Sequence, residues 1–268
     1  MTEPAPHLLF TREGPLAVLT LNRPESRNAL SESMRELLTQ ATRACETDDG
    51  VRAVLIRAEG ETFMAGGDVK GFNAGIAEDQ SAYAARFEPR IIAVHQMIYQ
   101  IRRMPKPVLV AAQGGVAGIG MSLLMAADLA IVSDDAFFTL AYRHIGLSAD
   151  GCATYLLPRI VGERRALEIA LLGERFPAAA AKALGLANWV VPRAELHAEA
   201  LRIATDLANG PTLALGLAKR LIRTSWDATW DEQSHREAEA MAIAATTQDH
   251  REGVRAFVEK RAPKFTGR

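Results

Sequence analysis

The sequence predicts an α/β core in residues 1–200, followed by a helical C-terminal region in residues 201–268. Apolar runs of strand length alternate with amphipathic helical patterns through the first part, and helical spacing dominates the second. A chain of 268 residues with 49% hydrophobic residues can bury a full core. By periodicity alone, strands that alternate with helices make a doubly wound parallel sheet the default architecture.

The N-terminal segment predicts two short strands, then a helix and a third strand. Leu8–Phe10 and Leu16–Leu21 are apolar and are separated by a Gly-Pro turn. After a polar loop, Ser31 is the expected N-cap of a helix whose apolar residues keep helical spacing. Val51–Arg57 is then a strand between two polar, glycine-containing turns.

Phe63–Lys70 is predicted to be a short apolar strand that Gly66 and Gly67 interrupt. A long helix follows and stops before Pro105. His95 lies near the apolar face of that helix, where a hydrogen-bonded core or interface histidine is the expected role. The residues of that face are Phe87, Ile91, Val94, Ile98 and Ile101.

The centre of the chain joins the strand Val108–Ala112 to a helix at Met121–Ala127 through the glycine-rich segment Gln113–Gly120. Glycines let backbone N–H groups approach a ligand, and the N–H groups at a helix N-terminus are free and favour negative charge. Such a turn can hold a phosphate, or the oxygen of a carbonyl that becomes an enolate. The remaining predicted strands are Leu129–Val132, Phe137–Leu140 and Trp189–Pro192.

Several ligand classes are excluded or disfavoured for these glycines. The dinucleotide fingerprint G-x-G-x-x-G is absent, since Leu123 stands at the third glycine position, and no Gly-Lys-Ser/Thr phosphate loop occurs. Ser122 lacks the second glycine of a nucleophile elbow. Two glycine turns remain, at Gly66-Gly67 and at residues 118–120, and each could offer one N–H to a single oxygen. The alternative that these glycines only turn corners stays open.

Composition limits the partners of the protein. A net charge of −1 gives no global field for nucleic acid or an anionic membrane, and no apolar run approaches about 18 residues. Two cysteines are too few for a disulfide framework or a cysteine-based zinc site. The N-terminus lacks the pattern of a secretory signal. We therefore expect a soluble, cytoplasmic protein without a metal, nucleic-acid or membrane partner.

The two glycine-containing segments Phe63–Lys70 and Gln113–Asp128 together resemble the crotonase superfamily, the enoyl-CoA hydratases and isomerases. Asn22–Leu30 is similar to the family's CoA-entry loop, Pro105–Val108 to the lead-in of its second glycine turn, and Gly253–Arg261 to its C-terminal helix. The resemblance implies a spiral of ββα units that holds an acyl-CoA site. It also implies a helical region that assembles a homotrimer or a hexamer made of two trimers.

The same resemblance implies the site residues. The oxyanion donors would be the backbone N–H groups of Gly67 and Ile119, and Phe257 and Lys260 would reach the CoA of a neighbouring subunit. No separate cofactor is implied, because coenzyme A is part of the substrate. The other implied substrate contacts are Ser26, Arg27, Ala29, Ala65, Asp68, Val69, Lys70 and Tyr142.

The chain departs from the hydratase pattern at the catalytic positions. Hydratases of the family use two glutamates, and this chain has Ser122 and Tyr142 at the matching positions. Neither is a carboxylate base near neutral pH. Asp150 instead falls where single-acid members carry their catalytic residue, and residues 151–162 resemble Δ3,Δ2-enoyl-CoA isomerases and ring-epoxide isomerases. The resemblance therefore implies that Asp150 shuttles a proton between two carbons while the oxyanion donors hold the enolate.

Alternatives to this assignment remain at the level of sequence. Asp150 could be only a helix N-cap, could position water for hydration, or could attack carbon covalently. Cys152 with His144 could suggest a thiolate nucleophile, although a buried small thiol is the expected role of Cys152. A binding protein without catalytic activity is the alternative from another class, and a carboxylate at position 150 argues against it.

Overall fold

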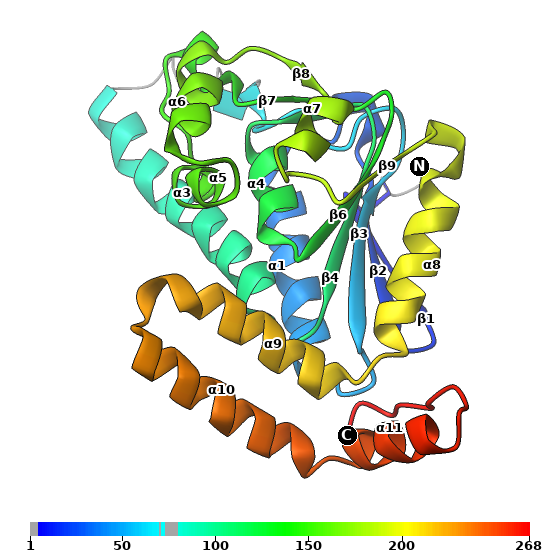
Figure 1. The fold of residues 1–268 in the computed structure, drawn as a ribbon. Coiled ribbons are helices and arrows are strands. Elements are labelled where there is room, and N and C mark those ends of the chain that lie inside the picture. The colour runs from blue at the N-terminus through cyan, green and yellow to red at the C-terminus, as the bar shows by residue number, and fades with distance from the viewer. Residues whose placement is uncertain (1–4, 70, 73–79) are drawn as a thin grey trace.

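The computed structural model describes residues 5–69, 71–72 and 80–268. Its centre is a six-stranded sheet in the order β1-β2-β3-β4-β6-β9 (Figure 1). The first two strands are antiparallel and all later neighbours are parallel. The strands are β1 (Leu8–Glu13), β2 (Leu16–Leu21), β3 (Ala53–Ala58), β4 (Val108–Ala112), β6 (Leu129–Ser133) and β9 (Trp189–Val191).

A smaller three-stranded sheet contains β5 (Gly115–Ala117), β7 (Phe137–Thr139) and β8 (Phe176–Pro177). The chain passes from β4 to β5 and then into α4 (Ile119–Ala126). It repeats this path from β6 to β7 and then, after a short 3-10 turn, into α5 (Ala153–Val161). Each path is one strand of each sheet followed by a helix, so the spiral of ββα units is confirmed.

The doubly wound sheet expected from periodicity is wrong. In such a sheet the strand order reverses at one point, whereas here the order β1-β2-β3-β4-β6-β9 never reverses. The helix α8 (Leu196–Ala208) packs against one face of the large sheet. The successive helices α1 (Glu32–Thr47), α3 (Gln80–Arg103) and α4 all join the core on the other face (Figure 1). Local periodicity fails here because it identifies strands and helices without showing which of two sheets each strand joins.

Local signals in the sequence explain most element boundaries. The Ser31 hydroxyl accepts a hydrogen bond from the Met34 N–H and caps α1, as predicted. Every residue of β2 and of β4 is buried, which is typical of strands inside a parallel sheet covered on both faces. The strand predicted at residues 63–70 is wrong: the described residues form only isolated bridges at Met64 and Gly67. Gly66, with φ of 109°, interrupts the extended backbone there.

The helical C-terminal region lies beneath the sheet, at the opposite end of the molecule from β7 and β8 (Figure 1). It comprises α9 (Thr212–Thr224), α10 (Trp230–Ala245) and α11 (Gln248–Val258). Two further helices, α6 (Glu163–Leu172) and α7 (Ala178–Ala183), lie between α5 and β9 in the chain. Among the described residues, no helix combines the length and apolarity that a membrane crossing requires.

Candidate active site

The two glycine turns predicted from the sequence meet in space. The Met64 N–H donates to the Gly115 carbonyl at 3.0 Å, and the Ala117 N–H donates to the Met64 carbonyl at 2.9 Å. These bonds form a parallel bridge between Met64 and Val116. Because the two segments are parallel, the residues that follow Met64 lie beside the residues that follow Val116.

The positive φ of Gly118, 51° with ψ of −118°, places it just before α4 in a conformation that favours glycine. A Cβ atom added there would lie 3.6 Å from the Cα of Gly66. Within the part of the chain that the structure describes, the backbone N–H groups of Gly67 and Ile119 donate no hydrogen bond. Both residues line a cavity of about 440 Å³. The arrangement can present two N–H donors to one oxygen.

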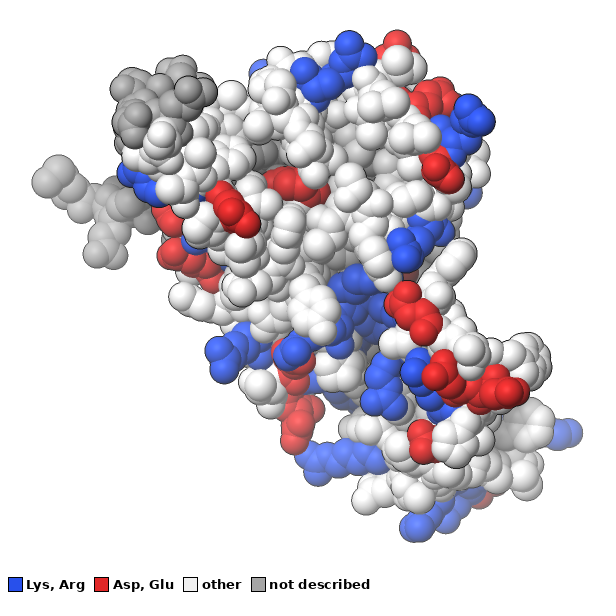
Figure 2. All heavy atoms as spheres, turned by 90° about the vertical axis from the view of Figure 1, so that its left-hand side faces the viewer, with Lys and Arg blue, Asp and Glu red and all other residues white. Residues whose placement is uncertain are grey.

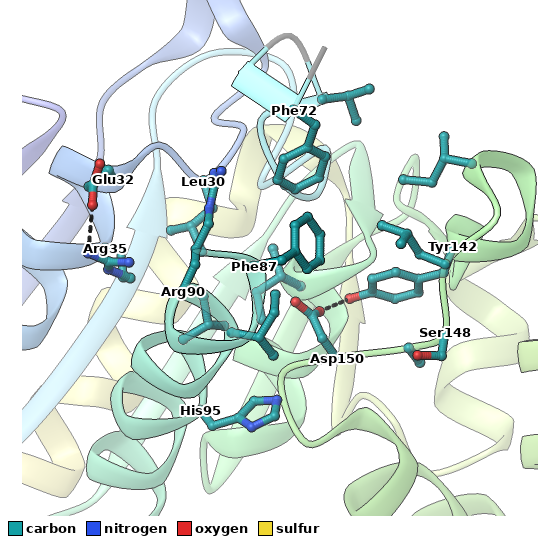
Figure 3. A pocket seen from close by; sticks show the side chains of 18 of the residues that line it. Leu30, Glu32, Arg35, Phe72, Phe87, Arg90, His95, Tyr142, Ser148 and Asp150 are labelled. Atoms are coloured by element: carbon teal, nitrogen blue, oxygen red, sulfur yellow. Dashed lines mark hydrogen bonds and ion pairs between the residues drawn. The ribbon is translucent and has the colours of Figure 1, made fainter. Parts of the chain in front are cut away.

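Asp150 lines the same cavity and is fixed by a neighbouring phenol (Figure 3). The Tyr142 hydroxyl donates to Oδ1 of Asp150 at 2.5 Å. No residue among those described donates to Oδ2. One carboxylate oxygen is therefore held by the protein, and the other is available to a ligand.

Burial and the adjacent Asp150 carboxylate raise the pKa of the Tyr142 phenol. Both causes disfavour the charged phenolate. The hydroxyl therefore keeps its proton near neutral pH and remains a donor to Asp150. Tyr142 cannot take the role of a second base, in agreement with the expectation from the sequence.

The backbone at Asp150 and Gly151 packs closely against α4. Gly151 has φ of +60°, and a Cβ there would lie 2.2 Å from the Ile119 side chain. The Ser122 hydroxyl, which is fully buried, donates to the Asp150 carbonyl at 3.3 Å. Ser122 thus supports the loop and does not line the cavity. The N-cap of α5 is Cys152, and the Asp150 side chain bonds Tyr142, so the helix-cap alternative is wrong.

The rest of the cavity wall is mostly apolar. Arg90 also lines it, with its guanidinium 4.7 Å from the centre of the Phe72 ring. The second carboxylate in the lining, Glu32, is 74% exposed beside Arg35, on the other side of the cavity from Asp150 (Figure 3). The apolar wall includes Val69, Phe72, Phe87, Ile91, Val94 and Leu147.

The loops expected to contact CoA lie against one another. The Ala65 N–H donates to the Arg27 carbonyl at 3.0 Å, and the Ala29 N–H donates to the Ser26 carbonyl at 3.0 Å. These backbone bonds bring the residue 26–29 loop beside the first glycine turn. Val69 lines the cavity, whereas Lys70 lies outside the described residues.

This region also contains an ion pair that was not predicted from the sequence. Arg23 Nη1 lies 3.0 Å from Asp68 Oδ2. Partial burial opposes the charge of Asp68, but the Gly71 N–H and Arg23 outweigh it and lower the pKa of that carboxyl. No spacing rule connects positions 23 and 68, and only the fold brings them together.

Phe257 and Lys260 do not reach this cavity. Phe257 is 86% exposed on α11, and Lys260 is exposed just after the same helix. That helix lies at the opposite end of the molecule from β7 and β8 (Figure 1). The contact of Phe257 and Lys260 with CoA stays a prediction.

The thiolate alternative at Cys152 is wrong. The His144 ring nitrogen Nε2 bonds the Gly173 carbonyl at 3.2 Å, and no hydrogen bond joins His144 to Cys152 among the described residues. Burial raises the pKa of the Cys152 thiol, which disfavours the nucleophilic thiolate.

Comparisons with known proteins agree with the geometry. The family described as "Enoyl-CoA hydratase/isomerase" matches residues 11–268. The 1,2-epoxyphenylacetyl-CoA isomerase of Escherichia coli is 36% identical over 93% of this chain and 94% of its own. The trans-2-decenoyl-[acyl-carrier-protein] isomerase of Streptococcus mutans is 33% identical over 97% and 98%. The crystal structure of an enoyl-CoA hydratase from Polaromonas superposes with a TM-score of 0.90 at 34% identity, covering 97% and 99% of the chains.

Proposed function

The chain belongs to the enoyl-CoA hydratase/isomerase family, and from this premise we propose that it shifts a carbon–carbon double bond in an acyl-CoA thioester. The substrate would be a Δ3-enoyl-CoA, or a ring-containing acyl-CoA that reacts through the same kind of intermediate. The observation that carries the proposal is the Asp150 carboxylate, which has one oxygen without a partner among the described residues, in a cavity that Gly67 and Ile119 also line.

In the proposed reaction, the Asp150 carboxylate takes a proton from C2 of a 3-enoyl thioester. The electrons of the C–H bond delocalise into the thioester, whose oxygen becomes negative and accepts hydrogen bonds from the N–H groups of Gly67 and Ile119. The protonated Asp150 then returns the proton to C4, and the double bond forms between C2 and C3. No atom is gained or lost, so one acid–base group is sufficient.

Hydration is the second candidate. The name of the Polaromonas structure favours it, and Asp150 with Tyr142 could orient one water molecule. The established route in hydratases of the family uses two glutamates, and here the matching positions hold a buried Ser122 and a Tyr142 that keeps its proton. We therefore rank isomerisation above hydration, and both above a binding protein without activity.

We predict that isomerisation is faster than hydration. The purified protein would be given 3-enoyl-CoA and 2-enoyl-CoA in parallel, with the products identified by chromatography and mass spectrometry. Movement of the 3-enoyl double bond should dominate, because one carboxylate can do this without activating water. Efficient formation of 3-hydroxyacyl-CoA, with no movement of a 3-enoyl double bond, would contradict the proposal and favour hydration.

The C-terminal helices support a further part of the proposal, assembly into a homotrimer or hexamer. Large apolar side chains on α10 and α11 are exposed in one chain, including Trp230 at 85% and Phe257 at 86%. Large exposed apolar side chains that cluster commonly mark protein–protein contacts. In such an assembly, Phe257 and Lys260 could contact the CoA bound by a neighbouring subunit.

Lys260→Ala is therefore expected to raise the Michaelis constant more than it lowers turnover. Lys260 would meet a CoA phosphate across a subunit boundary, and added salt would weaken the same interaction. Steady-state kinetics at two ionic strengths measures this, with Lys182→Ala, an exposed lysine of α7, as the matched control. A monomer by light scattering, or equal effects of both variants, would contradict it.

A further inference from the structure

His95 lies at the boundary between two cavities. It lines the 440 Å³ cavity that contains Asp150, and it also lines a groove of about 810 Å³ between α3, α5 and α9. Among the described residues, it is the only one common to both linings. Figure 3 shows its ring below Asp150, on the side of α3. The side chain therefore forms part of the wall that separates the acyl site from the groove.

The position of His95 on α3 explains this boundary. Ile91 and Val94 face the cavity before it, and Ile98 and Tyr99 face the groove after it. The part of α3 that lines the cavity runs from Phe87 to His95. At 1.5 Å per residue this part of the helix is about 12 Å long. Beyond His95 the same helix lines the second space.

The His95 ring has no hydrogen-bond partner in the part of the chain that the structure describes. Its Nε2 atom is buried without a partner, and neither ring nitrogen bonds another described residue. The hydrogen-bonded core histidine expected from the sequence is therefore wrong within the described chain, and the interface histidine stays a prediction. A buried polar atom without a partner costs free energy, and an apolar side chain of similar size would avoid that cost. A ligand atom that reaches the ring, with Nε2 exposed by rotation, would supply the missing partner.

We propose that His95 ends the acyl site and hydrogen-bonds an oxygen atom carried by the acyl group beyond C4. This inference rests on the proposed function and narrows its substrate class. The preferred substrates are compact, oxygen-bearing acyl-CoA thioesters. Long unbranched hydrocarbon chains are disfavoured, because they must pass the ring to enter the groove.

The test compares two probes, 3-hexenoyl-CoA and 6-hydroxy-3-hexenoyl-CoA, which differ only in the distal oxygen. The measured quantity is the ratio of their kcat/KM values. His95→Leu should lower the preference for the hydroxylated probe by about 10- to 100-fold, since the polar partner is lost. His95→Gln, which keeps a polar group, should recover part of it. His95→Ala should raise kcat/KM for 3-dodecenoyl-CoA relative to 3-hexenoyl-CoA, because it opens the wall.

Binding of the saturated analogues, hexanoyl-CoA and 6-hydroxyhexanoyl-CoA, separates this inference from the proposed function. Calorimetry on the same variants gives the preference even if the protein moves no double bond. A loss of preference in His95→Leu without isomerase activity would sustain the inference and reject the proposed function. An equal loss of affinity for both analogues, or an unchanged ratio in a variant with normal thermal unfolding, would overturn the role of His95.

Discussion

Turnover of Asp150→Asn is expected to fall by about 10²–10⁴-fold, the range that a general base contributes. The amide has nearly the same shape, and its oxygen can still accept the hydrogen bond from Tyr142. It cannot take a proton at neutral pH. Because Cys152 is the residue at the N-cap of α5, loss of a helix cap cannot explain a fall in rate.

The control for Asp150→Asn is binding of a saturated acyl-CoA, which should change by less than about tenfold, because the proposed oxyanion donors are backbone groups. Tyr142→Phe is the matched variant, since it removes the hydroxyl that holds Asp150 and leaves the carboxylate in place. It should lower turnover less than Asp150→Asn does. In the Asn background it should add little, because the two residues act as one unit. Near-normal isomerase activity of Asp150→Asn would remove Asp150 from the mechanism.

The sequence predicts elements well where one signal dominates. The Ser31 cap and the apolar strand Val108–Ala112 stand in the structure as the sequence indicates. The sequence misses β5, which lies inside the glycine-rich segment Gln113–Gly120, and β8, which has only two residues. Neither forms an apolar run of strand length, whereas the equally short β7 and β9 do. The strand expected at residues 63–70 fails for a related reason: its pairing is confined to single bridges.

The candidate site also has residues that the sequence predicts and roles that only the structure reveals. Spaced motifs indicate Gly67, Ile119 and Asp150, and the structure places all three around one cavity. The role of Tyr142 as the donor to Asp150 needs coordinates, because residues eight positions apart in a loop have no fixed relation. His95 lies on a predicted helix face, but the sequence does not indicate that two cavities meet there.

A mostly buried charge cluster that attaches the C-terminal helices to the sheet was also not predicted from the sequence. Asp128 follows α4, with its Oδ2 2.7 Å from Lys219 Nζ and its Oδ1 2.7 Å from Arg223 Nη2, both on α9. Its Oδ2 also accepts the Val108 N–H at 2.7 Å. Basic side chains gather in the hollow between the upper body and the helices below (Figure 2). Burial lowers the pKa of Lys219 to about 8 and that of Arg223 to about 10, although Asp128 opposes both shifts.

Asp128→Asn is expected to destabilise the fold by about 3–5 kcal/mol, because it leaves two mostly buried cations without their carboxylate. The measurement is the free energy of unfolding from urea denaturation at pH 7. The deficit should also depend on pH. Since the folded pKa of Lys219, about 8, lies below its ordinary 10.5, the unfolded state binds more protons between these values, and this group makes stability rise with pH. Loss of Asp128 should lower the folded pKa of Lys219 below about 8. The part of the deficit that comes from Lys219 should therefore shrink as the pH rises from that lower pKa to about 8, and should be largely lost above pH 8.

The matched control is Glu168→Gln, which breaks the exposed pair between Glu168 and Arg165 on α6. Both side chains of that pair are about half exposed, and such pairs contribute only about 0–1 kcal/mol. The two variants make the same kind of change, a carboxylate to an amide, so the difference between them isolates burial. If Asp128→Asn unfolds at the same urea concentration as Glu168→Gln, the cluster does not hold α9 to the sheet. The attachment would then rest on apolar packing and on contacts such as the close approach of Gly216 to Pro105.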